Sequence, residues 1–153
     1  MASTITPSTL SVEIKEQLTL GGAVYDQTKT HTISGVGNIF KRIYTLTAQT
    51  ATQLANFDTA PTSPEFDYDD IKYIRITNLD DTNTVIITKS SATTAGAEEV
   101  VAGGSIFMMN GAKQVAGAGT KAAITTLAAL DTLYAYSATA TVTLDLEVVI
   151  ATA

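Results

Sequence analysis

The sequence predicts an all-β fold, an antiparallel β-sandwich or jelly-roll-like barrel with at most a short helix. Apolar and polar residues alternate with a period of two near both ends of the chain, which is typical of half-buried strands. The 153 residues include 27 threonines, whose β-branched side chains favour strands over helices. Gly-rich turns separate short strand-like runs. The length fits one domain with one sizeable core.

The first predicted strand follows a small polar segment at 1–9, which we expect to be a flexible arm. Its apolar positions all share one parity: Leu10, Val12, Ile14, Leu18 and Leu20. Gly21-Gly22 ends this strand, and the polar stretch at 23–38 carries no strand prediction. The domain itself is expected to span 10–153.

The middle of the chain predicts a strand near 39–47 and then a loop at 56–70, where two prolines and five acids exclude a central strand. The stretch "IKYIRITNLDDTNTVIITKS", at 71–90, places an apolar run on each side of a polar cluster. Asn and Asp favour turns because their side chains bond their own backbone. This stretch therefore predicts a β-hairpin.

Two further hairpins are predicted towards the C-terminus. In "EEVVAGGSIFMMNG", Gly103-Gly104 occupies the turn. "TLYAYS" should pair with "TVTLDLEVVI", a strand with one apolar and one polar side. Between these hairpins, residues 111–132 are rich in Ala and Gly. Partial helical spacing there allows a short helix carrying Ile124, Leu127, Ala128 and Asp131.

Composition excludes several classes of function. The net charge is −6 with only nine Lys and Arg, spread along the chain, so we expect no nucleic-acid partner. The absence of Cys excludes disulfides and thiolate metal sites. The N-terminus lacks the basic and apolar regions of a secretory signal, and no apolar run is long enough for a membrane helix.

Few residues suggest chemistry. His31 is the only histidine, and the sequence supplies no nucleophile or fellow ligand for it, so a loop or strand-edge position is the simpler interpretation. The metal hypothesis, a Ca²⁺ site, rests on Asp67, Asp69, Asp80 and Asp81 with their neighbour Asp70. They lack the Gly and Glu positions of an EF-hand, and turn chemistry alone explains them. We therefore expect no cofactor and no enzymatic activity.

Several apolar residues are candidates for a subunit interface or the core rather than for a cofactor site. They lie in the runs at 71–78 and 106–109: Tyr73, Ile74, Phe107, Met108 and Met109.

The order of these pieces resembles small virion structural proteins of tailed bacteriophages, particularly those of aquatic and cyanobacterial hosts. The shared pieces are "VEIKEQLTLGGAVY", "IKYIRITNLDDTNTVII", "VVAGGSIFMMNG" and "DTLYAYSATATVTLDLEVVIATA". The resemblance covers roughly residues 10–151. Its most specific part is "YIRITNLDDTN", followed some twenty residues later by an "AGGS" turn. None of these motifs is catalytic, so no catalytic residue is carried over.

The resemblance implies a β-sandwich subunit of a virus particle, and it suggests a capsid decoration (cement) protein on the capsid exterior. Its expected partners are the major capsid protein and further copies of itself, as a dimer or trimer, with no nucleic acid and no membrane. Two alternatives stay open. One is a tail, neck or fibre component that recognises the host, and the other is a Ca²⁺-dependent carbohydrate-binding module or hydrolase that uses the aspartates.

Overall fold

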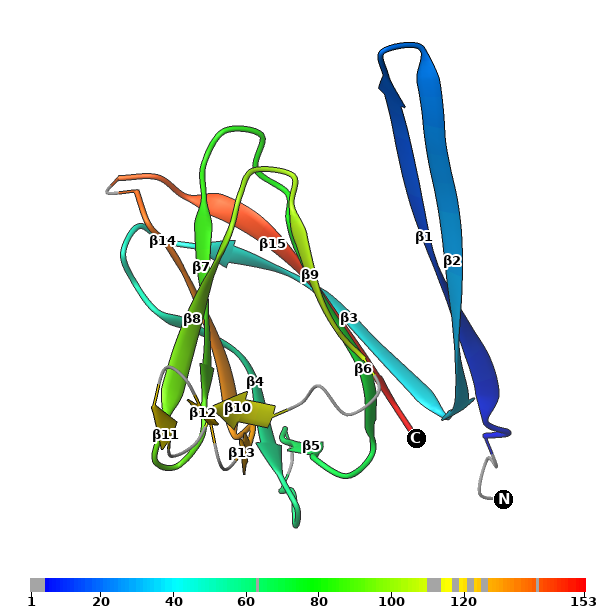
Figure 1. Cartoon of the computed structure of the whole chain (residues 1–153). Coiled ribbons are helices and arrows are strands. Elements are labelled where there is room, and N and C mark those ends of the chain that lie inside the picture. Colours follow the sequence, from blue (N-terminus) through cyan, green and yellow to red (C-terminus); the bar gives the residue numbers. More distant parts are fainter. Residues whose placement is uncertain are drawn as a thin grey trace.

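The computed structural model describes residues 5–62, 64–109, 114–116, 119–120, 123–124, 127–139 and 141–153. Within these residues all the regular structure is β-strand (Figure 1). The strands in chain order are β1 (Ser8–Leu20), β2 (Ala23–Val36), β3 (Asn38–Leu46), β4 (Thr52–Asp58), β5 (Phe66–Asp67), β6 (Ile71–Asn78), β7 (Val85–Ser90), β8 (Ala95–Val100), β9 (Ser105–Met109), β10 (Gln114–Ala116), β11 (Gly119–Thr120), β12 (Ala123–Ile124), β13 (Leu127–Ala129), β14 (Thr132–Ser137) and β15 (Leu144–Thr152).

Two facing sheets form the body of the molecule. One has four strands in the order β3-β15-β6-β9, and the other has five in the order β5-β4-β14-β7-β8. The pairings within both sheets are antiparallel, apart from a two-residue parallel pairing of β4 with β5. The predicted antiparallel sandwich is thus confirmed. In the described residues the two sheets do not close into a barrel.

Successive strands of the body mostly alternate between the two sheets, which is the arrangement of a jelly roll. The chain crosses from one sheet to the other between β3 and β4, between β5 and β6, between β6 and β7, between β8 and β9, and between β14 and β15. By contrast, β7 and β8 are neighbours in sequence and in space, and they pair as a hairpin.

The three hairpins predicted from the sequence are therefore wrong as pairings, although their strands are present. β6 pairs with β9 and β15, whereas β7 pairs with β8 and β14. In the same way, β8 does not pair with β9, and β14 does not pair with β15. Local alternation tells which residues share one side of a strand, but not which strand lies beside it. A connection between sheets also uses the same Gly, Asn and Asp residues as a hairpin turn.

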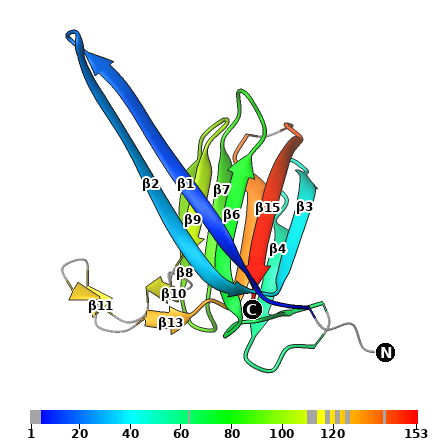
Figure 2. The same ribbon diagram turned by 90° about the vertical axis from the view of Figure 1, so that its right-hand side faces the viewer.

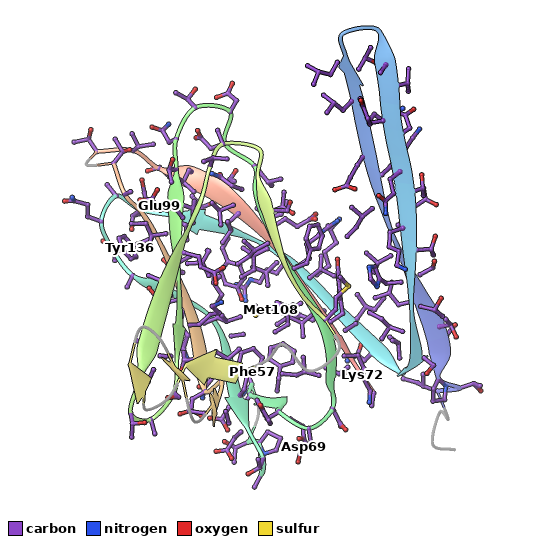
Figure 3. All side chains as sticks on the ribbon, in the orientation of Figure 1. Phe57, Asp69, Lys72, Glu99, Met108 and Tyr136 are labelled. Atoms are coloured by element: carbon purple, nitrogen blue, oxygen red, sulfur yellow. The ribbon has the colours of Figure 1, made fainter. Side chains whose placement is uncertain are left out.

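The core lies between the two sheets and is built from the apolar side of each strand. Leu46, Ile74, Ile76, Ile87, Leu133, Leu146, Val148 and Ile150 are among its fully buried side chains. Phe57 and Met108 come from opposite sheets and lie between them (Figure 3). Each large apolar side chain buried in this way contributes roughly 1.5–3 kcal/mol to folding.

Asn78 is a fully buried polar residue, and it joins two of the connections that cross between the sheets. Its side-chain Nδ2 lies 2.8 Å from the carbonyl oxygen of Asn83 and 3.0 Å from that of Val100, and it donates to both. Its backbone N–H donates to the carbonyl of Gly104, and Gly103 donates to the carbonyl of Asp80. The β6–β7 and β8–β9 connections therefore form one hydrogen-bonded unit.

The short helix expected within 111–132 is a wrong prediction. The described parts of this range are the short strands β10 to β13, and β10 pairs with β13 while β11 pairs with β12. Of the predicted helical positions, Ile124 lies in β12, whereas Leu127 and Ala128 lie in β13. Partial helical spacing is weak evidence in a stretch of small residues, because Ala and Gly fit either period.

β1 and β2 form a long two-stranded hairpin outside the sandwich (Figures 1 and 2). The polar stretch 23–38 thus contains a strand that the sequence did not predict. β1 begins at Ser8, so the last two residues of the expected 1–9 arm belong to a strand, and residues 1–4 lie outside the described residues.

Candidate functional site

The hairpin is shaped by its turn. Gly21 and Gly22 link β1 to β2 directly, with φ angles of 58° and 83°. A two-residue hairpin turn of this kind needs positive φ at both central positions, which glycine adopts without steric cost. The strands stay in register from Leu20–Ala23 at the turn to Leu10–Ile33 near the body.

The base of the hairpin is anchored on the outer face of the four-stranded sheet. Ile33, Val36, Tyr73 and Ala151 form a second buried cluster, separate from the main core. Leu10, Val12, Met109 and Val149 pack against it. The backbone N–H of Gly37, at the junction of β2 and β3, donates to the carbonyl of Thr152. A Cβ at Gly37 would lie 2.9 Å from the backbone of Ala153, so only glycine fits this junction.

The outer part of the hairpin has no cover. Every residue from Lys15 to Thr30 is exposed, although most of them belong to regular strands. In Figures 1 and 2 this part rises away from the sandwich, with its turn as the far end. We call residues 15–30 the outer hairpin. An isolated two-stranded hairpin is marginally stable in water, so this length of exposed ribbon is unusual.

The two sides of the outer hairpin differ in chemistry. Registered pairs alternate between the sides, because successive side chains of a strand point in opposite directions. The side continuous with the anchor carries Leu18, Leu20 and Tyr25 near the turn, with Glu16, Gln27 and Lys29 between them and the anchor. The opposite side carries polar pairs such as Lys15–Thr28 and Gln17–Asp26, with Val24 near the turn. The apolar side therefore extends the anchoring surface into solvent.

The outer face of the four-stranded sheet also stays partly open beyond the anchor. Ile39, Ile43 and Phe107 are exposed there. Beside them, Glu147 of β15 accepts from Arg75 of β6 and lies 2.7 Å from Lys41 Nζ of β3. The hydrogen bond from Lys41 lowers the pKa of the Glu147 carboxyl, and Arg75 adds to this effect while partial burial opposes it. We call this region the open sheet face.

The interface candidates from the sequence fall in three different places. Ile74 and Met108 point into the sandwich core. Tyr73 and Met109 lie on the outer side of the sheet, where the hairpin base covers them. Phe107 is exposed on the open sheet face, and it is therefore the candidate that a partner can reach in this structure.

The aspartates of the metal hypothesis lie at opposite ends of one strand. Asp67 and Asp69 precede β6, whereas Asp80 and Asp81 follow it. Because β6 has eight residues, the two groups are about 25 Å apart at ~3.4 Å per residue. Figure 3 places Asp69 at the lower end of the body. Among the described residues, no group of three or more acidic or histidine side chains is arranged to hold a metal.

Two of these aspartates, Asp67 and Asp80, bond to the backbone of their own turns. Asp67 Oδ1 accepts from the N–H of Asp69. Asp80 Oδ1 accepts from the N–H groups of Thr82, at 2.8 Å, and Asn83. The hydrogen bonds from Asn83 and Thr82 lower the pKa of Asp80. These hydrogen bonds support the interpretation of Asp67 and Asp80 as turn residues.

A groove at the β3–β4 edge of the sandwich is a further candidate. Phe40 and Phe66 meet edge to face in its wall, and the Arg42 guanidinium lies 5.0 Å from the ring centre of Tyr44. Its polar groups bond to one another, since Tyr44 donates to the Leu54 carbonyl and Asn56 donates to Glu65. In a ligand site the polar groups converge on the ligand, whereas here they bond to one another. The groove is therefore better explained as an edge where the two sheets are held together.

His31 is half-buried in β2, opposite Val12 at the base of the hairpin. The sequence analysis missed β2 as a whole, and with it Tyr25, Ile33 and Val36. The available signal was Gly21-Gly22 itself, because a Gly-Gly pair after an alternating strand predicts a two-residue turn and a return strand. The return strand is rich in Thr and Lys, so its alternation is weak.

Searches against protein-family models, curated proteins and solved structures find no match to this chain. Among the described residues, no helix is long and apolar enough to cross a membrane.

Proposed function

We propose that this protein is a structural subunit of a bacteriophage particle, a capsid decoration protein that binds and stabilises the assembled head. The observation that carries the proposal is the combination of a jelly-roll body with a projecting, apolar-sided hairpin. Such an arm exposes apolar surface that a freely diffusing domain would bury, and large exposed apolar patches mark interaction sites. Jelly rolls recur in viral capsid proteins, and also in lectins and cupins.

The sequence resemblance supports the same role. Its most specific part pairs "YIRITNLDDTN" with a later "AGGS" turn, and these segments form the two connections that Asn78 joins. The two motifs therefore belong to one structural unit. The two joined connections shape one end of the body. The resemblance therefore concerns the architecture of the protein and does not imply a shared chemical activity.

The proposal gives the protein no catalytic role and no cofactor. Its partners are the major capsid protein and further copies of itself, on the capsid exterior. A protein that binds only the assembled head stabilises that state by mass action. The net charge of −6 keeps decorated particles apart in solution.

Copy number tests this proposal. Purified particles should contain the protein in numbers that match the capsid lattice positions, and particles stripped of it should release their genome at a lower temperature. Adding the purified protein back should restore the original melting temperature. A few copies per particle, or antibody labelling at one vertex, would instead favour the tail, neck or fibre alternative.

A further inference from the structure

The outer hairpin has an apolar side that no other described part of the chain covers. Leu18, Leu20 and Tyr25 are 54%, 66% and 60% exposed. The same side, at the hairpin base, shows what this surface binds, since Leu10, Val12 and Ile33 pack on the outer face of the four-stranded sheet. The outer hairpin thus continues a surface whose natural contact is that sheet.

The same sheet has exposed apolar side chains that its own hairpin does not cover. Ile39, Ile43 and Phe107 are 54%, 56% and 43% exposed on the open sheet face. Within one chain these side chains cannot cover the outer hairpin, because it rises away from the body (Figures 1 and 2). Each copy therefore carries an uncovered apolar hairpin side and an uncovered sheet face, whose exposed apolar side chains lie on its two edge strands, β3 and β9.

The charges of the two surfaces suit contact between copies. On the apolar side of the outer hairpin the charged side chains are Glu16 and Lys29, because Lys15 and Asp26 point to the opposite side. Those of the open sheet face are Lys41, Arg75, Asp145 and Glu147. Each set has as many positive as negative groups and sums to zero, whereas the whole chain carries −6. A contact between these two surfaces therefore adds no net repulsion, whereas the rest of the acidic surface repels random contact.

We infer that the outer hairpin of one copy packs on the open sheet face of a second copy of this chain. A chain that carries both halves of a contact can form a closed oligomer, in which every hairpin and every sheet face is occupied. The contact brings Leu18 and Tyr25 onto a face whose exposed apolar side chains include Ile43, on β3, and Phe107, on β9. This inference concerns self-assembly and does not depend on the virion role.

Size-exclusion chromatography with light scattering tests the contact on the full chain. The wild type should elute as a multiple of its 16.0 kDa monomer. Leu18→Thr with Tyr25→Thr should give monomers, and so should Ile43→Thr with Phe107→Thr. Thr preserves the strand preference of each site, and a cross-strand Thr pair keeps the hairpin together. Circular dichroism melts verify that both variants are folded.

The matched control is Gln17→Thr with Asp26→Thr. This registered pair is the neighbour of Leu18–Tyr25 but points to the other side of the ribbon. It should leave the oligomer intact, because it removes nothing from the contact.

Mixing provides the decisive measurement. Neither double variant has an intact contact alone, but the hairpin of the Ile43/Phe107 variant can still bind the sheet face of the Leu18/Tyr25 variant. The mixture should therefore form complexes larger than either monomer. A monomeric wild type, or oligomers that survive both double variants, would overturn the inference. Loss of assembly with the hairpin variant alone would point to hairpin–hairpin contact, and loss only of capsid binding would make the capsid protein the occupant. Either result contradicts the proposed contact.

Discussion

Asn78 is the residue whose substitution tests the architecture most directly. Its Nδ2 group donates to the carbonyls of Asn83 and Val100, at 2.8 and 3.0 Å, and lies 3.2 Å from that of Val101. Its Oδ1 accepts from the N–H of Asp80 at 3.1 Å. Asn78→Asp keeps the shape of the side chain but removes the donor, so it isolates the hydrogen bonds from the volume of the residue.

The expected loss follows from these contacts. An amide carries two hydrogens, so the three carbonyls share two full bonds, and the bond into Oδ1 is a third. At about 1 kcal/mol net for each bond, Asn78→Ala should cost about 3 kcal/mol, and a cavity adds to this. Asn78→Asp turns a buried negative charge towards carbonyl oxygens, and it should cost about 3–5 kcal/mol. Asn78→Asp changes the shape of the side chain less than Asn78→Ala, but it is expected to lower the stability at least as much.

Urea unfolding measures both variants. With a slope of about 2 kcal/mol per molar urea, a loss of 3 kcal/mol moves the midpoint down by about 1.5 M. Asp81→Asn in the same turn is the control, because Asp81 is exposed and accepts from the Thr82 hydroxyl. That control should stay within about 0.5 kcal/mol of the wild type. An Asn78→Asp protein as stable as the control would show that Asn78 does not join the two connections.

Three further outcomes are expected. Gly22→Ala should loosen the hairpin turn by about 1–2 kcal/mol, because φ is 83° there, and hydrogen exchange should quicken in the outer hairpin while the body stays protected. Asp80→Ala should lower the melting temperature at neutral pH and not in acid. The lowered pKa of Asp80 stabilises the fold above the unfolded carboxyl pKa, and this contribution disappears as pH falls through the folded pKa. A chelator should leave the melting temperature unchanged, and a clear drop would revive the Ca²⁺ hypothesis.

Sequence reasoning located strands better than it paired them. The alternation of Val142, Leu144, Leu146 and Val148 correctly marked the last strand and its buried side, which begins at Leu144 in the structure. The turn residues around Asp80 and Gly103 correctly marked the ends of strands. Their predicted partners were wrong, because in this fold most strands that follow one another in the chain lie in opposite sheets.

The candidate site shows the same limit. Phe107 was singled out with Ile74, Met108 and Met109 because all four are apolar. Whether each of them is buried or exposed depends on which side of the sheet it faces and on whether the hairpin covers it. The sequence of one strand shows which residues share a side. Whether that side is buried depends on elements far away in the chain.

Local patterns in the sequence specify the class of the fold, the position of most strands, and the use of Asx and Gly residues as turns. These properties depend on backbone preferences and on local alternation, which a few neighbouring residues specify. The tertiary structure alone decided that 71–90 connects two sheets, that Asn78 joins two distant turns, and that an apolar-sided hairpin stands outside the body. Those features depend on contacts between segments tens of residues apart, where the geometry of the assembled sheets selects one pairing among many that local patterns allow equally.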